Sequence, residues 1–107
     1  MAARNELPKG LLDDVKNNLD ITWSDEATDK KISGLIASGM AYLDGKLGEE
    51  TDYTMDGNHR TLLMEFVRYA RDGALDVFEN NYLSLLLAAQ NARAVKQYAQ
   101  KSDAAQQ

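Results

Sequence analysis

Apolar residues recur every three or four positions along most of this 107-residue chain, and this spacing constrains the fold most strongly. The longest stripe consists of Leu62, Leu63, Phe66, Val67, Ala70, Ala74, Val77 and Phe78. A helix places positions three and four apart on one face, whereas a strand alternates with a period of two. Because no strand-like alternation is present, the sequence predicts an all-α fold.

Polar breaks separate the stripes, and together they predict a small bundle of about four helices. The helices are expected over residues 9–19, 25–46, 60–79 and 82–97. They form one domain over residues 9–97, which is a typical amount of sequence for a single domain. We expect a flexible N-terminus over residues 1–8 and a flexible C-terminal tail over residues 98–107.

Local signals set the expected boundaries. Ser24 precedes two acidic residues and is predicted to cap the second helix. An acidic loop is expected near residues 49–58, where an Asp-Gly step is a turn signal. The pair Asn80-Asn81 is the expected break between the last two helices, with one longer helix over residues 60–97 as the alternative.

Two glycines, Gly34 and Gly39, fall inside the predicted second helix. A glycine in a helix interior costs about 1 kcal/mol relative to alanine. We therefore expect another backbone to approach closely at these positions, either from within the domain or from a neighbouring chain. Gly45 and Gly48 are expected to end the helix.

Composition excludes several classes of protein. The chain has 17 acidic and 12 basic residues, a net charge of -5, and no basic stripe that would bind nucleic acid phosphates. The absence of cysteine excludes disulfides, cysteine-based zinc sites and thiol catalysis. No apolar run reaches the roughly 18 residues of a membrane helix, so we expect a cytoplasmic protein unless an assembly carries it elsewhere.

No catalytic, cofactor-binding or metal-binding residue is predicted, and we expect neither enzymatic activity nor a cofactor. The single histidine, His59, has no second histidine or cysteine to form a metal site. We interpret it as an exposed residue at a helix start. The acidic clusters are Asp13-Asp14, Asp25-Glu26 and Glu49-Glu50-Thr51-Asp52. They could bind a divalent cation, but the EF-hand spacing is absent and they fall on predicted solvent faces and loops, so we interpret them as solvated acids.

Three stretches carry a resemblance to a known family. They are residues 69–87, which read YARDGALDVFENNYLSLLL, residues 12–19, which read LDDVKNNL and precede Ile21 and Asp25, and residues 32–47, with Tyr42-Leu43 near their end. Over residues 9–90 the chain resembles the head–tail connector (adaptor, head-completion) proteins of tailed bacteriophages.

The resemblance implies a structural virion protein without catalytic residues. Connector proteins form a ring beneath the portal protein after DNA packaging, extend the DNA channel and provide the docking surface for stopper or tail-completion proteins. The implied partners are therefore other copies of the chain, the portal protein and the stopper, with no membrane. DNA passes through the channel without specific binding, and the implied location is the head–tail interface, after assembly in the host cytoplasm.

An apolar run over residues 85–89 also indicates a partner surface, because a helix that is apolar all round is usually buried on all sides. The predicted interface comprises Tyr82, Leu83, Leu85, Leu86, Leu87, Arg68, Arg71 and Asp72. Arg68 and Asp72 are i,i+4 neighbours on the predicted helix, and they pair either on one surface or across a subunit boundary. We expect Leu86→Asp to weaken assembly more than folding, with a core position for Leu86 as the alternative.

An alternative function is a small acidic cytoplasmic regulator or DNA mimic. Such a protein presents acids on one face at the spacing of phosphates. The acids of this chain instead scatter over several predicted helices and a loop, which favours the connector hypothesis.

Overall fold

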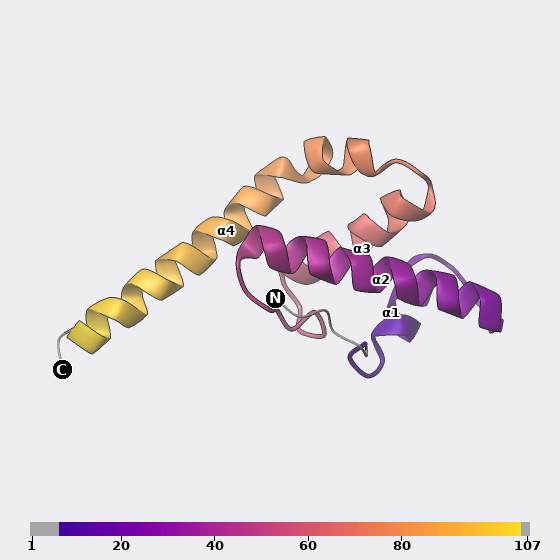
Figure 1. Cartoon of the computed structure of the whole chain (residues 1–107), viewed down its shortest axis with the longest axis horizontal. Coiled ribbons are helices and arrows are strands. Elements are labelled where there is room, and N and C mark those ends of the chain that lie inside the picture. Colours follow the sequence, from indigo (N-terminus) through magenta and orange to yellow (C-terminus); the bar gives the residue numbers. More distant parts are fainter. Residues whose placement is uncertain (1–6, 106–107) are drawn as a thin grey trace.

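The computed structural model describes residues 7–105, with side chains for residues 7–99. Within this range the fold is all-α, as predicted (Figure 1). The helices are α1 (Leu11–Asn18), α2 (Glu26–Leu47), α3 (Asn58–Arg71) and α4 (Leu75–Ala105). The flexible stretch predicted at the N-terminus falls largely on residues 1–6, which lie outside the described residues.

The start of α2 differs from the prediction by one residue. Asp25, not Ser24, is the N-cap, and its carboxylate accepts hydrogen bonds from the Thr28 backbone N–H (3.1 Å) and hydroxyl (2.9 Å). These two bonds lower the pKa of Asp25. Upstream, Ile21 is buried in the core and fills the junction between α1 and α2.

Gly39 brings α2 and α3 into close contact. A Cβ atom at this position would lie 2.8 Å from Leu63 Cδ1 and 2.8 Å from Phe66 Cδ1, and both side chains are buried. Side chains of α3, and not the predicted backbone, therefore make the close approach at Gly39. At Gly34 nothing of the same chain lies within 4 Å, so no close approach within the domain exists there.

We expect Gly39→Ala and Gly34→Ala to change stability in opposite directions. At Gly39 the added methyl group overpacks the core at about 1–3 kcal/mol, which exceeds the gain in helix propensity of about 1 kcal/mol. At Gly34 nothing is overpacked, so only the gain in helix propensity applies, and we expect a stabilisation of roughly 0.5–1 kcal/mol. Urea denaturation followed by circular dichroism measures both, and equal stabilisation by the two substitutions would contradict the close contact.

The predicted break at Asn80-Asn81 is wrong, because the chain turns earlier. α3 ends at Arg71, and Gly73 adopts a φ of 72°, in the left-handed region that favours glycine. The Ala74 N–H donates to the Tyr69 carbonyl (2.8 Å), which closes a Schellman turn. Asn81 lies inside α4 and donates to the Tyr69 hydroxyl (3.0 Å).

α4 packs on the bundle through its first half and then extends away from it (Figure 1). The predicted end at residue 97 is wrong, since the helix continues to Ala105. The radius of gyration of 15.5 Å exceeds the roughly 13 Å of a compact domain of this length. The molecule measures 55 × 29 × 23 Å, and the projecting helix gives it this elongated shape.

Candidate interaction surface

The predicted interface residues of α4 lie on two different faces of the helix. Leu86 is only 3% exposed and belongs to the core, whereas Leu83 and Leu87 are 50% and 49% exposed. Tyr82 and Leu85 are partly buried and pack against the core cluster. The run that is apolar all round therefore has an inner half that packs against α2 and α3 and an outer half in contact with solvent.

Leu86 is a core residue, which is the alternative that the sequence left open. A buried aspartate without a partner costs several kcal/mol of folding free energy. Leu86→Asp would therefore unfold the domain and cannot isolate an effect on assembly. Leu83 and Leu87 are the positions at which a charge tests the surface without entering the core.

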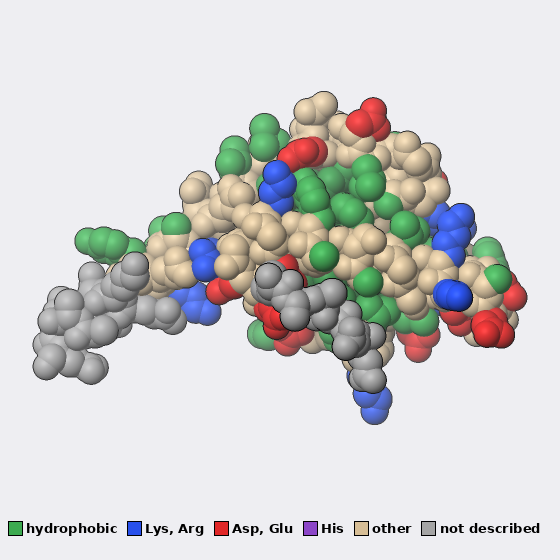
Figure 2. All heavy atoms as spheres, in the orientation of Figure 1, with side chains coloured by type: hydrophobic (Ala, Val, Ile, Leu, Met, Phe, Trp, Pro, Cys, Tyr) green, Lys and Arg blue, Asp and Glu red, His purple; other side chains and the backbone are tan. Residues whose placement is uncertain are grey.

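The exposed side of α4 forms one continuous surface, which we call the outer face. It comprises Leu83, Ser84, Leu87, Asn91, Ala94, Val95 and Tyr98, all of which are exposed. These positions repeat at intervals of three or four residues, so they share one side of the helix. Figure 2 shows hydrophobic side chains along this edge of α4, on the body and on the projecting part.

Four of the eight large hydrophobic side chains that are exposed among the described residues lie on the outer face, namely Leu83, Leu87, Val95 and Tyr98. Two more, Leu75 and Val77, are exposed at the start of α4, and the other two are Trp23 and Met55. No charged residue occurs between Glu79 and Arg93. Interface centres are depleted of charge in the same way and enriched in aromatic residues.

Arg68, Arg71 and Asp72 lie on a separate surface from the outer face. They line a shallow polar hollow with Asn18, Leu19 and Asp20, at the C-terminal ends of α1 and α3. The Arg68 guanidinium donates to the Asn18 carbonyl (3.3 Å) and lies 3.8 Å from the Glu65 carboxylate. Asp72 caps the end of α3, and its backbone N–H donates to the Arg68 carbonyl, while the Arg68 side chain pairs with Glu65.

The beginning of α4 is fastened to α2 by an ion pair. Glu79 Oε1 lies 3.2 Å from Lys46 Nζ, with both side chains about half exposed. Hydrogen bonding from Lys46 lowers the pKa of Glu79, with the Tyr42 hydroxyl as a smaller contribution. The same carboxylate raises the pKa of Lys46.

This pair predicts a pH dependence of stability. A carboxyl with a lowered folded pKa stabilises the protein above its unfolded pKa, near 4.5, and that contribution is lost as the pH falls through the folded pKa. We expect Glu79→Gln to lower the melting temperature slightly at pH 6 and by less at pH 3, because Glu79 becomes increasingly protonated as the pH falls below its unfolded pKa. Calorimetry at the two pH values measures this, and a difference independent of pH would contradict it.

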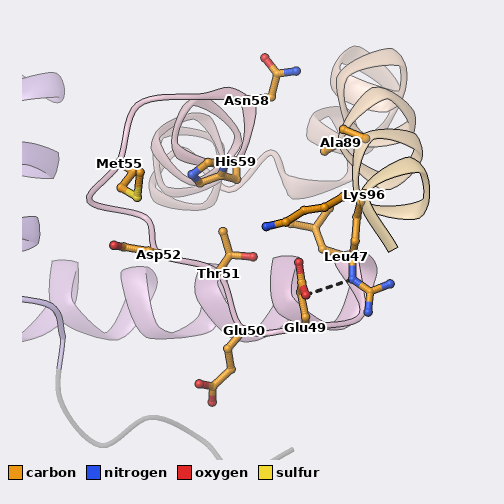
Figure 3. A pocket seen from close by; sticks show the side chains of 12 residues that line it. Leu47, Glu49, Glu50, Thr51, Asp52, Met55, Asn58, His59, Ala89 and Lys96 are labelled. Carbon is orange, nitrogen blue, oxygen red and sulfur yellow. Dashed lines mark ion pairs between the residues drawn. The ribbon is translucent and has the colours of Figure 1, made fainter. Parts of the chain in front are cut away.

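A cleft of about 520 Å³ lies between the acidic loop and α4 (Figure 3). Its lining includes Glu49, Glu50 and Met55 from the loop, His59 from α3, and Lys96 from α4. His59 is half-buried rather than exposed, with its ring edge-on to the Tyr53 ring at 6.1 Å. The cleft mixes acids and bases, so it favours no single class of ligand.

Arg93 closes one end of this cleft. Its Nε lies 3.4 Å from the Glu49 carboxylate, the contact drawn as a dashed line in Figure 3. Its Nη2 donates to the Gly48 carbonyl (3.3 Å). These contacts place the loop against α4 at the point where the helix leaves the body.

The loop itself is fixed by a buried carboxylate. Tyr53 is fully buried, and its hydroxyl donates to Asp44 Oδ1 (2.8 Å), which also accepts the Thr51 backbone N–H (3.2 Å). Arg60 Nη1 donates to the Tyr53 carbonyl (3.0 Å). The loop is therefore an ordered wall of the cleft.

We expect Tyr53→Phe to destabilise the fold by about 1.5–3 kcal/mol, because a buried charged acceptor loses a donor. Chemical denaturation measures the loss. Tyr98→Phe is the matched control, since Tyr98 is 75% exposed and its hydroxyl has no role in the core. Equal effects of the two substitutions would contradict the anchoring role of Tyr53.

No family model matches this chain, and no curated protein or solved structure matches it either. Among the described residues, no group of three or more histidine, cysteine, aspartate or glutamate side chains is arranged to hold a metal ion. Within the same range, no helix is long and apolar enough to span a bilayer.

Proposed function

We propose that this protein is a structural head–tail connector of a tailed bacteriophage. It forms a ring beneath the portal protein, extends the DNA channel and offers a docking surface to stopper or tail proteins. The observation that carries the proposal is α4, a helix that leaves the bundle and exposes apolar side chains along its length. The resemblance over residues 9–90 supplies the identity of the assembly.

The surface properties support an assembly role. Exposed contiguous apolar surface on a small soluble domain marks a binding site for another protein. A ring also requires a heterologous interface, in which one patch of each copy meets a different patch of the next. The outer face of α4 is one such patch, and the helix that carries it projects from the body, where it can reach a neighbouring copy (Figure 1).

The charge balance agrees with a channel through which DNA slides. DNA affinity depends on lysine and arginine placed against phosphates. The chain is acidic overall, with a net charge of -5. Such a protein lines a channel without retaining the DNA.

The alternative, an acidic regulator or DNA mimic, is less favoured by the ion pairs. A mimic presents unpaired carboxylates at the spacing of phosphates. Here several acids are already paired with bases of the same chain, as in Lys16–Asp29, Lys46–Glu79, Arg60–Asp14 and Arg93–Glu49. These pairs come from different parts of the fold, so they form no single acidic face.

Binding to the portal protein of the same phage tests the proposal. We expect the full chain to co-sediment with assembled portal and to add a ring visible by electron microscopy. Leu83→Asp should reduce co-sedimentation by about tenfold or more, because it places a charge in an apolar interface. Absence of binding at low and moderate salt would contradict the connector role.

The matched control is Met55→Asp. Met55 is 63% exposed but lies on the acidic loop, away from the outer face. It adds the same charge to an exposed apolar position, and we expect it to leave portal binding unchanged. Circular dichroism verifies that both variants remain folded.

A further inference from the structure

The dipeptide Asp-Gly occurs three times in this chain, at Asp44-Gly45, Asp56-Gly57 and Asp72-Gly73. This dipeptide is chemically reactive, because the backbone nitrogen of the glycine can attack the side-chain carboxyl of the aspartate. A glycine has no Cβ to obstruct the ring closure. The dipeptides themselves are identical, so a difference in reactivity between the three steps comes from the fold.

We propose that Asp56 is a site of spontaneous isomerisation to isoaspartate, and that the fold protects the other two steps. The Gly57 nitrogen forms a bond to Asp56 Cγ, and the carboxyl hydroxyl and the amide hydrogen leave as water. Water then adds to the resulting succinimide ring and opens it at either carbonyl. One opening restores aspartate, and the other gives isoaspartate, in which the main chain runs through Cβ and Cγ. Nothing is oxidised or reduced, and no component other than water is required.

Both reacting groups at Asp56-Gly57 are accessible. The Asp56 side chain has a relative exposure of 105%, and its carboxylate lies 3.9 Å from Arg60 Nε, a weak surface contact. Within residues 7–105, the Gly57 N–H donates to no acceptor. The attacking nitrogen is therefore not held by a hydrogen bond, and the carboxyl can rotate toward it.

The fold requires the glycine that makes Asp56 reactive. Gly57 has a φ of 149°, which other residues rarely adopt, and a Cβ at this position would lie 2.9 Å from His59 Cε1. The dipeptide lies between Met55 and Asn58, both labelled in Figure 3, where the loop enters α3. The reactive step is therefore a built-in feature of this exposed loop.

At Asp44-Gly45 the fold blocks both reacting groups. Gly45 lies inside α2, where each backbone N–H donates to the carbonyl four residues earlier. The Asp44 carboxylate is buried and accepts hydrogen bonds from the Tyr53 hydroxyl (2.8 Å) and the Thr51 N–H (3.2 Å). Ring closure at this step therefore requires local unfolding at the end of α2.

At Asp72-Gly73 the carboxyl is exposed, but the backbone is fixed. The Gly73 N–H donates to the Ala70 carbonyl (3.1 Å), and the Asp72 N–H donates to the Arg68 carbonyl (3.2 Å). Ring closure here requires the turn between α3 and α4 to open. Because local opening costs free energy and adds to the reaction barrier, we expect Asp56 to isomerise about tenfold faster or more than Asp44 and Asp72.

The product is expected to stay folded but to differ at the start of α3. Isoaspartate adds a methylene group to the main chain directly before Gly57, the N-cap of α3, and moves the carboxylate away from Arg60. Arg60 retains its contacts with Asp14 (3.0 Å) and with the Tyr53 carbonyl (3.0 Å). The modification therefore alters the tip of the loop and leaves in place the contacts that fix the rest of it.

Peptide mapping of the full chain, stored at neutral pH and physiological temperature, tests the proposal. Trypsin cleaves after lysine and arginine, so it separates the three steps into the peptides 32–46, 47–60 and 72–93. Chromatography resolves isoaspartyl from aspartyl peptides of equal mass, and electron-transfer fragmentation identifies the modified residue. We expect isoaspartate to accumulate at Asp56 about tenfold or more above the level at Asp44 and Asp72.

Storage in a denaturing concentration of guanidinium chloride is the control for the fold. We expect the three steps to isomerise at similar rates there, because the hydrogen bonds that protect two of them are lost. Equal accumulation at the three steps in the folded protein would overturn the proposal. An absence of isoaspartate at Asp56 in the folded protein, under conditions in which the denatured chain forms it, would overturn it as well.

Asp56→Glu is the matched variant, because it keeps the charge and the following glycine. The larger ring that a glutamate would form closes far more slowly than succinimide. We expect the isoaspartyl product to disappear from the peptide 47–60, while the circular dichroism spectrum of the variant stays unchanged. Persistence of the product in this peptide would assign the reaction to Asp52 and overturn the proposal.

Discussion

The packing of Phe78 at the centre of an aromatic cluster holds the last helix to the body. Its ring lies 5.6 Å from Phe66 of α3, 6.3 Å from Tyr42 of α2, and 5.3 Å from Tyr82 of α4 itself. Phe78 is 1% exposed, and aromatic pairs of this kind contribute about 0.5–1.5 kcal/mol each beyond the area they bury. Because the cluster fixes which side of α4 faces inward, it also fixes which side remains outside.

The turn before this cluster determines the direction of α4. Gly73 takes up a left-handed conformation, and the Tyr69 carbonyl is bonded by Ala74 within the same turn. Tyr69 also contacts Phe78 and Tyr82 through its ring. The turn and the aromatic cluster therefore share a residue, so the reversal of the chain and the docking of α4 are mechanically coupled.

The sequence predicted the fold class and the number of helices, because its apolar residues recur at helical spacing. It did not predict the position of the last turn. A single Gly73 between helix formers resembles a tolerated interior glycine, whereas Asn80-Asn81 has the appearance of a break. The hydrogen bonds of the turn at Gly73 are local, but its choice over Asn80-Asn81 also reflects the packing of Phe78 and Tyr82 against Tyr69.

The sequence also did not show that α4 has one buried face and one exposed face. In a run of three leucines every position satisfies an apolar pattern, so spacing cannot assign Leu86 to the core and Leu87 to solvent. The assignment depends on Phe78 and on the path of α2 and α3, both of which are tertiary. The uncharged interval from residue 80 to residue 92 contains both leucines, so charge does not separate the two faces either.

The projecting end of α4 also depends on this anchoring. An isolated helix of about 12 residues is marginal in water, because forming the first turn is unfavourable while each further residue adds a hydrogen bond. Residues 94–105 continue a helix that is already formed and held by Arg93 at Gly48 and Glu49, so no new nucleus is required. Their alanine, lysine and glutamine residues favour this extension. This part of the helix therefore needs no partner to form. Its apolar side chains Val95 and Tyr98 are exposed beyond the body. Because no described part of the same chain covers them, they are available to a second chain.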